Sequence, residues 1–143
     1  HAGDRGIACE YCHADARRSI VAGIPGINTC MGCHAFVNTN AEPIKFLTEK
    51  YKSNTPIEWI KVHDLPDFVR FSHRIHMHAK GADGKNLLAC KSCHGPVEKM
   101  EVVGQWPPMQ MGWCVDCHKE MKALQPGSNV VRAVSTSCNT CHF

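Results

Sequence analysis

The feature that most constrains this chain is a short cysteine–histidine unit that occurs five times. Each unit has two cysteines separated by two residues and followed directly by a histidine, and the units begin at Cys9, Cys30, Cys90, Cys114 and Cys138. Two thiols three positions apart lie about one helical turn from each other, so each can form a thioether with one vinyl group of the same porphyrin. The imidazole that follows can then ligate the iron. The unit therefore predicts covalent attachment of a c-type haem.

All ten cysteines and half of the ten histidines of the chain belong to these units. The predicted attachment residues are Cys9, Cys12, Cys30, Cys33, Cys90, Cys93, Cys114, Cys117, Cys138 and Cys141, and the predicted proximal iron ligands are His13, His34, His94, His118 and His142. Zinc sites also use paired cysteines, and ten cysteines could form disulfides in a secreted protein. Neither alternative explains a histidine after every pair. The sequence therefore predicts five haem c groups as the cofactors.

The composition agrees with a fold that depends on a cofactor for its packing. Leu, Ile, Val and Phe together make up 29 of the 143 residues, which is a low share for a self-sufficient hydrophobic core. The formal charge is only +3, unlike that of a strongly charged disordered chain. Lysine and arginine are scattered without a basic run, which argues against a nucleic-acid partner. Apolar stretches are broken by glycine or proline and are too short to span a membrane.

The spacing of the units divides the chain into three parts. We expect a single pentahaem cytochrome c domain over residues 1–143, with a two-haem cluster over about 1–40, an insert over about 41–70 and a three-haem cluster over about 71–143. The expected fold has a few short α-helices and mostly irregular chain packed around five haems, with almost no sheet. Short helices are expected at the haem units.

The insert carries the only clear helical pattern in the sequence. Apolar side chains recur every three to four positions between residues 42 and 53, at Ile44, Leu47 and Tyr51, and a proline stands in the first turn. This pattern predicts a helix. A second, shorter helix is predicted from residue 66 to about residue 76.

Histidines outside the units are candidates for the second axial ligand of each iron. They are His1, His63, His73, His76 and His78. His73 and His76 are three positions apart, so they project from one helical face and can serve two different haems. His78 would point to the other side of such a helix. Methionine is the competing ligand, and Met109 or Met111 could act in that way, although packing of these side chains against a porphyrin face is the favoured interpretation.

The segments that connect the units resemble those of a known family, the pentahaem cytochrome c subunit of alternative complex III, a bacterial quinol-oxidising membrane complex. The similar segments are His1-Ala-Gly3, Ala22-Gly-Ile-Pro25, Trp59 to Val69, Phe71-Ser-His73, Cys93-His94-Gly-Pro-Val97 and Met111-Gly-Trp113-Cys114. The resemblance implies an electron-transfer subunit that is not itself an enzyme. It implies partners as well: an iron–sulfur subunit related to molybdopterin oxidoreductases, and monohaem cytochrome c subunits. The implied location is the periplasmic face of a bacterial inner membrane.

The resemblance also bears on the distal ligands. Sequences of the family usually begin with a Phe-x-His-x-x-His element like the one at residues 71–76. By comparison with that element, His1 corresponds to its second histidine. The first histidine would then lie upstream of this chain, together with a membrane anchor. The same comparison supports His63 as a ligand and leaves His78 as a spare. The implied distal ligands are thus His1, His63, His73 and His76.

Other functional classes remain open from the sequence alone. The chain could be a free periplasmic electron shuttle or an accessory cytochrome of another oxidoreductase. A catalytic multihaem reductase would need an open iron coordination position, which some such enzymes mark with a lysine in place of the unit histidine. The sequence has no Cys-x-x-Cys-Lys unit and has enough candidate distal histidines, so catalysis is disfavoured.

Overall fold

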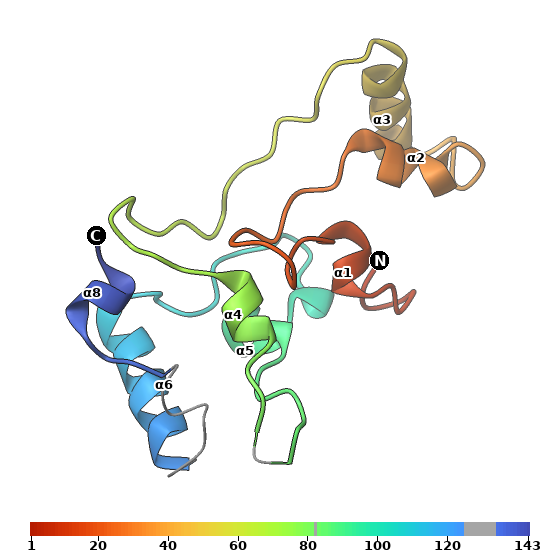
Figure 1. Ribbon diagram of the computed structural model, residues 1–143. Coiled ribbons are helices and arrows are strands. Elements are labelled where there is room, and N and C mark those ends of the chain that lie inside the picture. The colour runs from red at the N-terminus through yellow and green to blue at the C-terminus, as the bar shows by residue number, and fades with distance from the viewer. Residues whose placement is uncertain (82, 125–133) are drawn as a thin grey trace.

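The computed structural model describes residues 1–81, 83–124 and 134–143, and helices are its only regular elements in these ranges (Figure 1). They are α1 (Cys9–Cys12), α2 (Ile27–His34), α3 (Glu42–Lys52), α4 (His73–Met77), α5 (Cys90–His94), a 3₁₀ turn (Val97–Lys99), α6 (Met111–Leu124) and α8 (Cys138–Cys141). In the same ranges, β pairing is limited to isolated bridges, one between Val69 and His142 and one between Lys80 and Asn86. The predicted combination of a few short helices with almost no sheet is confirmed.

Each cysteine–histidine unit lies on a helix, as predicted. These helices are α1, α2, α5, α6 and α8; α1 and α8 span only the two cysteines and the two residues between them, and the unit histidine follows directly. The expectation that only the insert would hold clear regular structure is wrong, because α6 is 14 residues long. The strong helix formers Lys119, Glu120, Met121 and Lys122 follow the unit there and extend its single turn.

The predicted helix of the insert is confirmed as α3. Pro43 stands in its first turn, where a missing N–H costs nothing, and Lys50 and Lys52 lie in its last turn, where cations are favoured. Ile44 is buried. Helix α3 packs against α2, so the insert begins by folding back onto the second unit.

The second predicted helix is only partly correct, because α4 begins at His73 instead of residue 66. Residues 68–70 pair with the C-terminal end of the chain instead. The Arg70 N–H donates to the Cys141 carbonyl at 2.7 Å, and the Phe143 N–H donates to the Phe68 carbonyl at 3.3 Å. Chain that pairs in this way is extended, so a tertiary contact overrides the local helical pattern.

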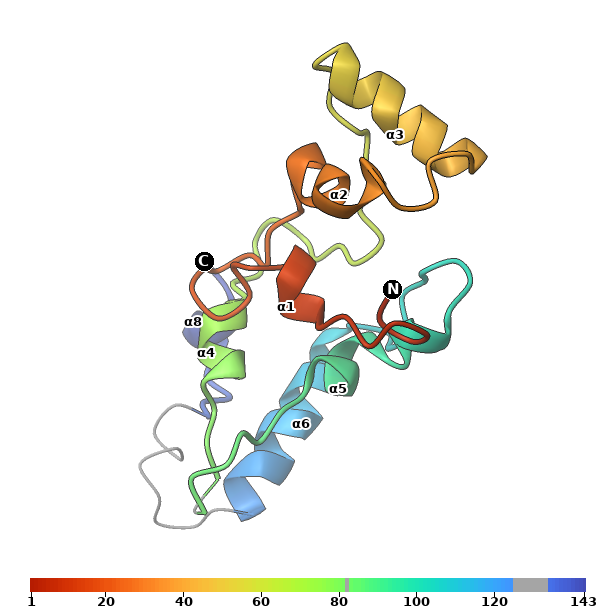
Figure 2. The same ribbon diagram turned by 90° about the vertical axis from the view of Figure 1, so that its right-hand side faces the viewer.

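The helices are spread along an elongated molecule. Helices α2 and α3 lie at one end, α1, α4 and α5 lie in the middle, and α6 and α8 lie toward the other end (Figures 1 and 2). None of the helices in the described ranges is both long and apolar enough to cross a bilayer.

Very little apolar surface is buried by the polypeptide itself. Ala16 and Ile44 are the buried hydrophobic residues of the described chain, whereas Phe36 and Ile60 are each 88% exposed. Apolar side chains in a folded domain normally pack on one another in a contiguous core. A chain that leaves them uncovered fits a fold in which porphyrin faces take the place of that core.

Candidate functional site

The two thiols of each unit are held by a single turn of helix. In α1 and α8 the N–H of the unit histidine donates to the carbonyl of the first cysteine at 2.9 Å, and this bond closes the turn. All ten thiols are free of disulfides. Each unit therefore presents two thiols and the next imidazole from one rigid turn, as covalent attachment of a porphyrin requires.

Five histidines each make the same kind of ring hydrogen bond, from Nδ1 to a backbone carbonyl, and this bond orients the ring for metal binding. In each, Nδ1 lies within hydrogen-bond distance of a backbone carbonyl: His13 with Gly23 at 2.8 Å, His34 with Val37 at 3.0 Å, His73 with Ile20 at 3.0 Å, His76 with Ser72 at 2.8 Å and His118 with Ser135 at 2.9 Å. A carbonyl oxygen only accepts, so Nδ1–H must donate and Nε2 keeps its lone pair. Metal-binding histidines are normally oriented by such a bond from the other nitrogen.

His63 has a nitrogen that the polypeptide leaves without a partner. Its Nε2 is buried and makes no hydrogen bond to any residue that the structure describes, and burial lowers the pKa of the ring, which favours the neutral form. An unsatisfied buried nitrogen is costly. A neutral imidazole with a free Nε2 is also the form that ligates iron, so His63 fits the role of a ligand.

His78 differs from these histidines in the nitrogen that it uses. Its Nε2 lies 2.9 Å from the carbonyl of Arg17, so Nε2 carries the proton and donates it. The nitrogen that is free in His73 and His76 is thus occupied in His78.

The rings of several unit histidines face those of predicted distal histidines. An iron with one imidazole on each face holds the two ring centroids about 6 Å apart, because a metal–nitrogen bond is about 2 Å long and the ring centre lies about 1 Å farther on. The structure places His1 5.8 Å from His34, His73 6.3 Å from His94 and His76 6.1 Å from His118, centroid to centroid. The separation of each pair is thus compatible with one iron between the two rings.

His63 stands in a different relation to its neighbour. Its ring lies edge-on to the ring of His94 with the centroids 4.5 Å apart, which is too close for the two to ligate opposite faces of one iron. Burial lowers the pKa of His94, and His63, His73 and His13 lower it further. The separation therefore argues against His63 as the second ligand of the iron predicted at His94.

Phe71 contacts both imidazoles of α4. It was not predicted from the sequence as a functional residue. Its ring stacks on His76 at 4.5 Å and meets His73 edge-on at 4.9 Å. The Phe-x-His-x-x-His spacing was the available signal. The carbonyl partners of the histidines carried no signal, because a carbonyl group is present in every residue.

Cysteines of different units are neighbours in space. Burial raises the pKa of five cysteines, and in four of them the thiol of another unit raises the pKa further. The neighbouring pairs are Cys30 with Cys12, Cys90 with Cys9, Cys93 with Cys117, and Cys114 with Cys141. The units thus form a connected series.

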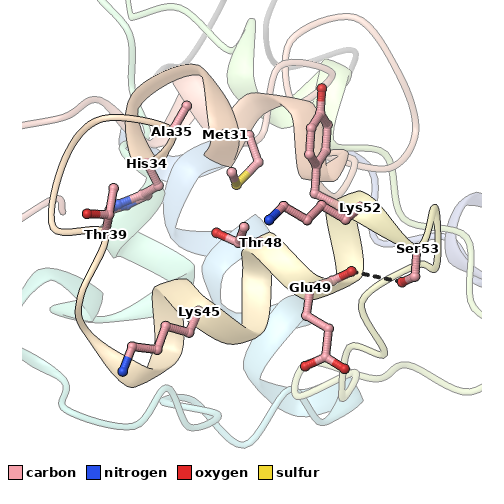
Figure 3. A pocket seen from close by; sticks show the side chains of 10 residues that line it. Met31, His34, Ala35, Thr39, Lys45, Thr48, Glu49, Lys52 and Ser53 are labelled. Atoms are coloured by element: carbon pink, nitrogen blue, oxygen red, sulfur yellow. Dashed lines mark hydrogen bonds between the residues drawn. The ribbon is translucent and has the colours of Figure 1, made fainter.

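A groove of about 770 Å³ lies between α2 and α3. His34 of the second unit lines it, together with Met31 from α2 and Thr48 and Lys52 from α3, and Figure 3 shows Met31 directed toward α3. A groove of this volume is in the range of cofactor sites. Helix α3 therefore borders the site of the second unit.

Comparison with known proteins identifies the family. Residues 69–143 match the family described as cytochrome c7 and related cytochrome c, and the match covers more than half of the chain. The chain belongs to this family. It is also 32% identical over 95 residues to the menaquinone reductase multihaem cytochrome c subunit of Nitratidesulfovibrio vulgaris. The aligned part is 66% of this chain but only 41% of that relative, so the chain spans less than half the length of the relative.

Family membership fixes the broad character of the protein. Cytochromes of this family bind c-type haem covalently, transfer electrons and are typically periplasmic. The described residues fit that cofactor, because paired thiols, free Nε2 atoms and uncovered apolar side chains occur together.

Proposed function

We propose that this chain is the electron-transfer subunit of a quinone-linked respiratory or photosynthetic membrane complex and holds five haem c groups. The ten unit cysteines would bind the porphyrins, and His13, His34, His94, His118 and His142 would be the proximal ligands. The observation that carries the proposal is the Nδ1–H···carbonyl hydrogen bond that three unit histidines and the two histidines of α4 have in common, which leaves Nε2 free in each.

The proposed distal ligands are His1, His63, His73 and His76. The ring separations support His1 for the second unit, His73 for the third unit and His76 for the fourth unit. The unpaired Nε2 of His63 supports it as a ligand of a further iron. The hydrogen bond from Nε2 of His78 supports leaving that residue out.

Each haem iron supplies a one-electron couple between the ferric and ferrous states. The chain would supply the rest: its thiols would hold each porphyrin, its five unit imidazoles and four further imidazoles would ligate iron, and its apolar side chains would exclude water from the porphyrins. Filled axial positions disfavour binding and turnover of a small substrate, so the chain is proposed to relay electrons without performing catalysis.

The proposed setting is a complex like alternative complex III on the periplasmic face of a bacterial inner membrane. The proposed partners are an iron–sulfur subunit related to molybdopterin oxidoreductases, which passes electrons to this chain, and monohaem cytochrome c subunits that accept them. The Nitratidesulfovibrio relative is a subunit of menaquinone reductase, which supports a quinone-linked complex. It also favours a second candidate, in which electrons flow through the chain toward menaquinone.

Haem content and coordination test the first part of the proposal. Mass spectrometry of the denatured chain should show five haem additions and no thiol that reacts with an alkylating reagent. Electron paramagnetic resonance of the oxidised native complex should show low-spin ferric iron throughout. Fewer than five additions, or a stoichiometric high-spin haem that binds nitrite, would contradict the proposal.

The setting is tested on the particle from which the chain is purified under mild detergent. A quinol analogue should reduce the haems of the intact particle if the complex oxidises quinol. If the haems, once reduced, are instead reoxidised by a menaquinone analogue and quinol does not reduce them, the second candidate is correct. Purification of the chain alone, free of any membrane partner, would refute both and favour a periplasmic shuttle.

A further inference from the structure

We infer that the five units are arranged in space in the order second, first, third, fourth and fifth, so that the first unit connects the second to the other three. The inference rests on the proposed function, because it takes each unit to carry a haem. It goes beyond that function by identifying the two ends of the haem series, at the second and fifth units.

Contacts between the first two units provide the first link. His1 precedes the first unit, and its ring lies 5.8 Å from that of His34 in the second unit. The thiol of Cys12 is close enough to Cys30 to raise the pKa of the Cys30 thiol. The second unit thus has the first unit on one side, and it has α3 along its groove.

The first unit also touches the third. The thiol of Cys9 contacts that of Cys90. Ahead of the first unit, Gly3 lies so close to the carbonyl of Glu98, just past the third unit, that an added methyl group would collide with it. Two separate points, one at the start of α1 and one ahead of it, therefore approach the region of the third unit.

The loop that follows the first unit makes an independent contact with α4. The carbonyl of Ile20 accepts both the backbone N–H and the Nδ1–H of His73, each at 3.0 Å. The guanidinium of Arg17 donates to the carbonyl of Met77 at 2.8 Å. Since the ring of His73 lies 6.3 Å from that of His94, this loop fixes a histidine that faces the third unit.

The remaining links follow the chain. Helix α4 lies next to both the third and the fourth unit, because the ring of His73 lies 6.3 Å from that of His94 and the ring of His76 lies 6.1 Å from that of His118. Raised cysteine pKa values agree, since Cys117 raises the pKa of Cys93 and Cys141 raises that of Cys114. His118 donates to the carbonyl of Ser135, which lies just ahead of the fifth unit. Figure 1 shows this succession of helices, from α2 through α1 and α5 to α6 and α8.

Removal of single haems distinguishes this order from the order of the units along the chain. Reduction of one haem lowers the potential of a close neighbour by electrostatic repulsion, and this effect falls with distance and is screened by salt. Loss of a terminal haem should therefore shift the potential of one remaining haem, whereas loss of an internal haem should shift two.

The variants replace both cysteines of one unit by alanine, and the potentials of the remaining haems are measured by spectroelectrochemical titration of the intact holoprotein. Cys30→Ala with Cys33→Ala should shift one potential, and Cys9→Ala with Cys12→Ala should shift two. The matched control removes the fifth haem, which is terminal in either order, and gives the size of a single shift. The reverse pattern, two shifts for the second unit and one for the first, would overturn the inference.

Two further readouts keep the test decisive. Mass spectrometry of each variant should show four haem additions, and a wild-type chain without five haems would refute the proposed function instead of the order. If a variant does not fold, nuclear magnetic resonance of the reduced wild-type holoprotein replaces it. Protons of the first haem should then show contacts to both the second and the third haem, and direct contacts between the second and third haems would refute the order.

Discussion

Replacement of His73 and His76 by alanine, singly and together, tests whether α4 links two haems. Both histidines lie on the same five-residue helix, but their rings lie near different unit histidines. The ring centroids of His73 and His94 are 6.3 Å apart, and those of His76 and His118 are 6.1 Å apart. Each substitution should therefore leave one iron five-coordinate, or with water as its sixth ligand, and convert it to the high-spin ferric state. The two irons should be different ones.

The magnitude follows from the number of units. One open iron among the five predicted haems gives a high-spin signal that integrates to about one-fifth of the total iron in each single variant. The double variant should give about two-fifths, because the effects of substitutions at separate irons add. If both histidines served one iron, the double variant would give only about one-fifth.

The measurement is spin quantification by electron paramagnetic resonance on the oxidised holoprotein, with iron determined independently. His78→Ala is the matched control, since it removes a nearby histidine whose Nε2 donates to the carbonyl of Arg17. This control should remain fully low-spin. A double variant with the same high-spin fraction as the single variants would refute the reasoning, and so would a high-spin signal in the control.

Three further substitutions have defined outcomes. His73→Met should keep every iron low-spin but raise the potential of one haem, because a thioether favours the ferrous state; an unchanged potential in the redox titration would exclude His73 as a ligand. His63→Ala should open one iron, seen as a high-spin fraction of about one-fifth of the five haems; a fully low-spin spectrum would show that its buried nitrogen serves no iron. Gly95→Ala should destabilise the chain by about 2–4 kcal/mol, since Gly95 has φ of 68° and an added methyl group would collide with Trp106. Gly104→Ala has open space and is the control in guanidinium unfolding followed by the haem absorbance; equal midpoints for the two variants would contradict that estimate.

The sequence predicted elements whose cause is local and missed those whose cause is tertiary. Helix α3 was predictable from its apolar repeat and its proline. The start of α4 at His73 was not, because residues 68–70 pair with the C-terminal residues, about 70 positions away along the chain. The length of α6 was underestimated, because the helix formers that follow its unit extend the helix beyond a single turn.

The candidate site divides in the same way. The unit cysteines and histidines were predictable because covalent attachment and proximal ligation need only one turn of chain. The i,i+3 spacing of His73 and His76 also indicated two different irons. The carbonyl partners of the rings, the use of Nε2 by His78 and the spatial order of the units depend on contacts between distant segments, and no local pattern encodes them.

Before any porphyrin is bound, the same contacts between units would endanger the maturation of the chain. The folded polypeptide brings the thiols of Cys9 and Cys90 together, as well as those of Cys12 and Cys30. In an oxidising compartment such thiols form disulfides, and a single cross-link of this kind would block two attachment sites at once. If the chain is exported as proposed, attachment of haem before the chain compacts would avoid such cross-links.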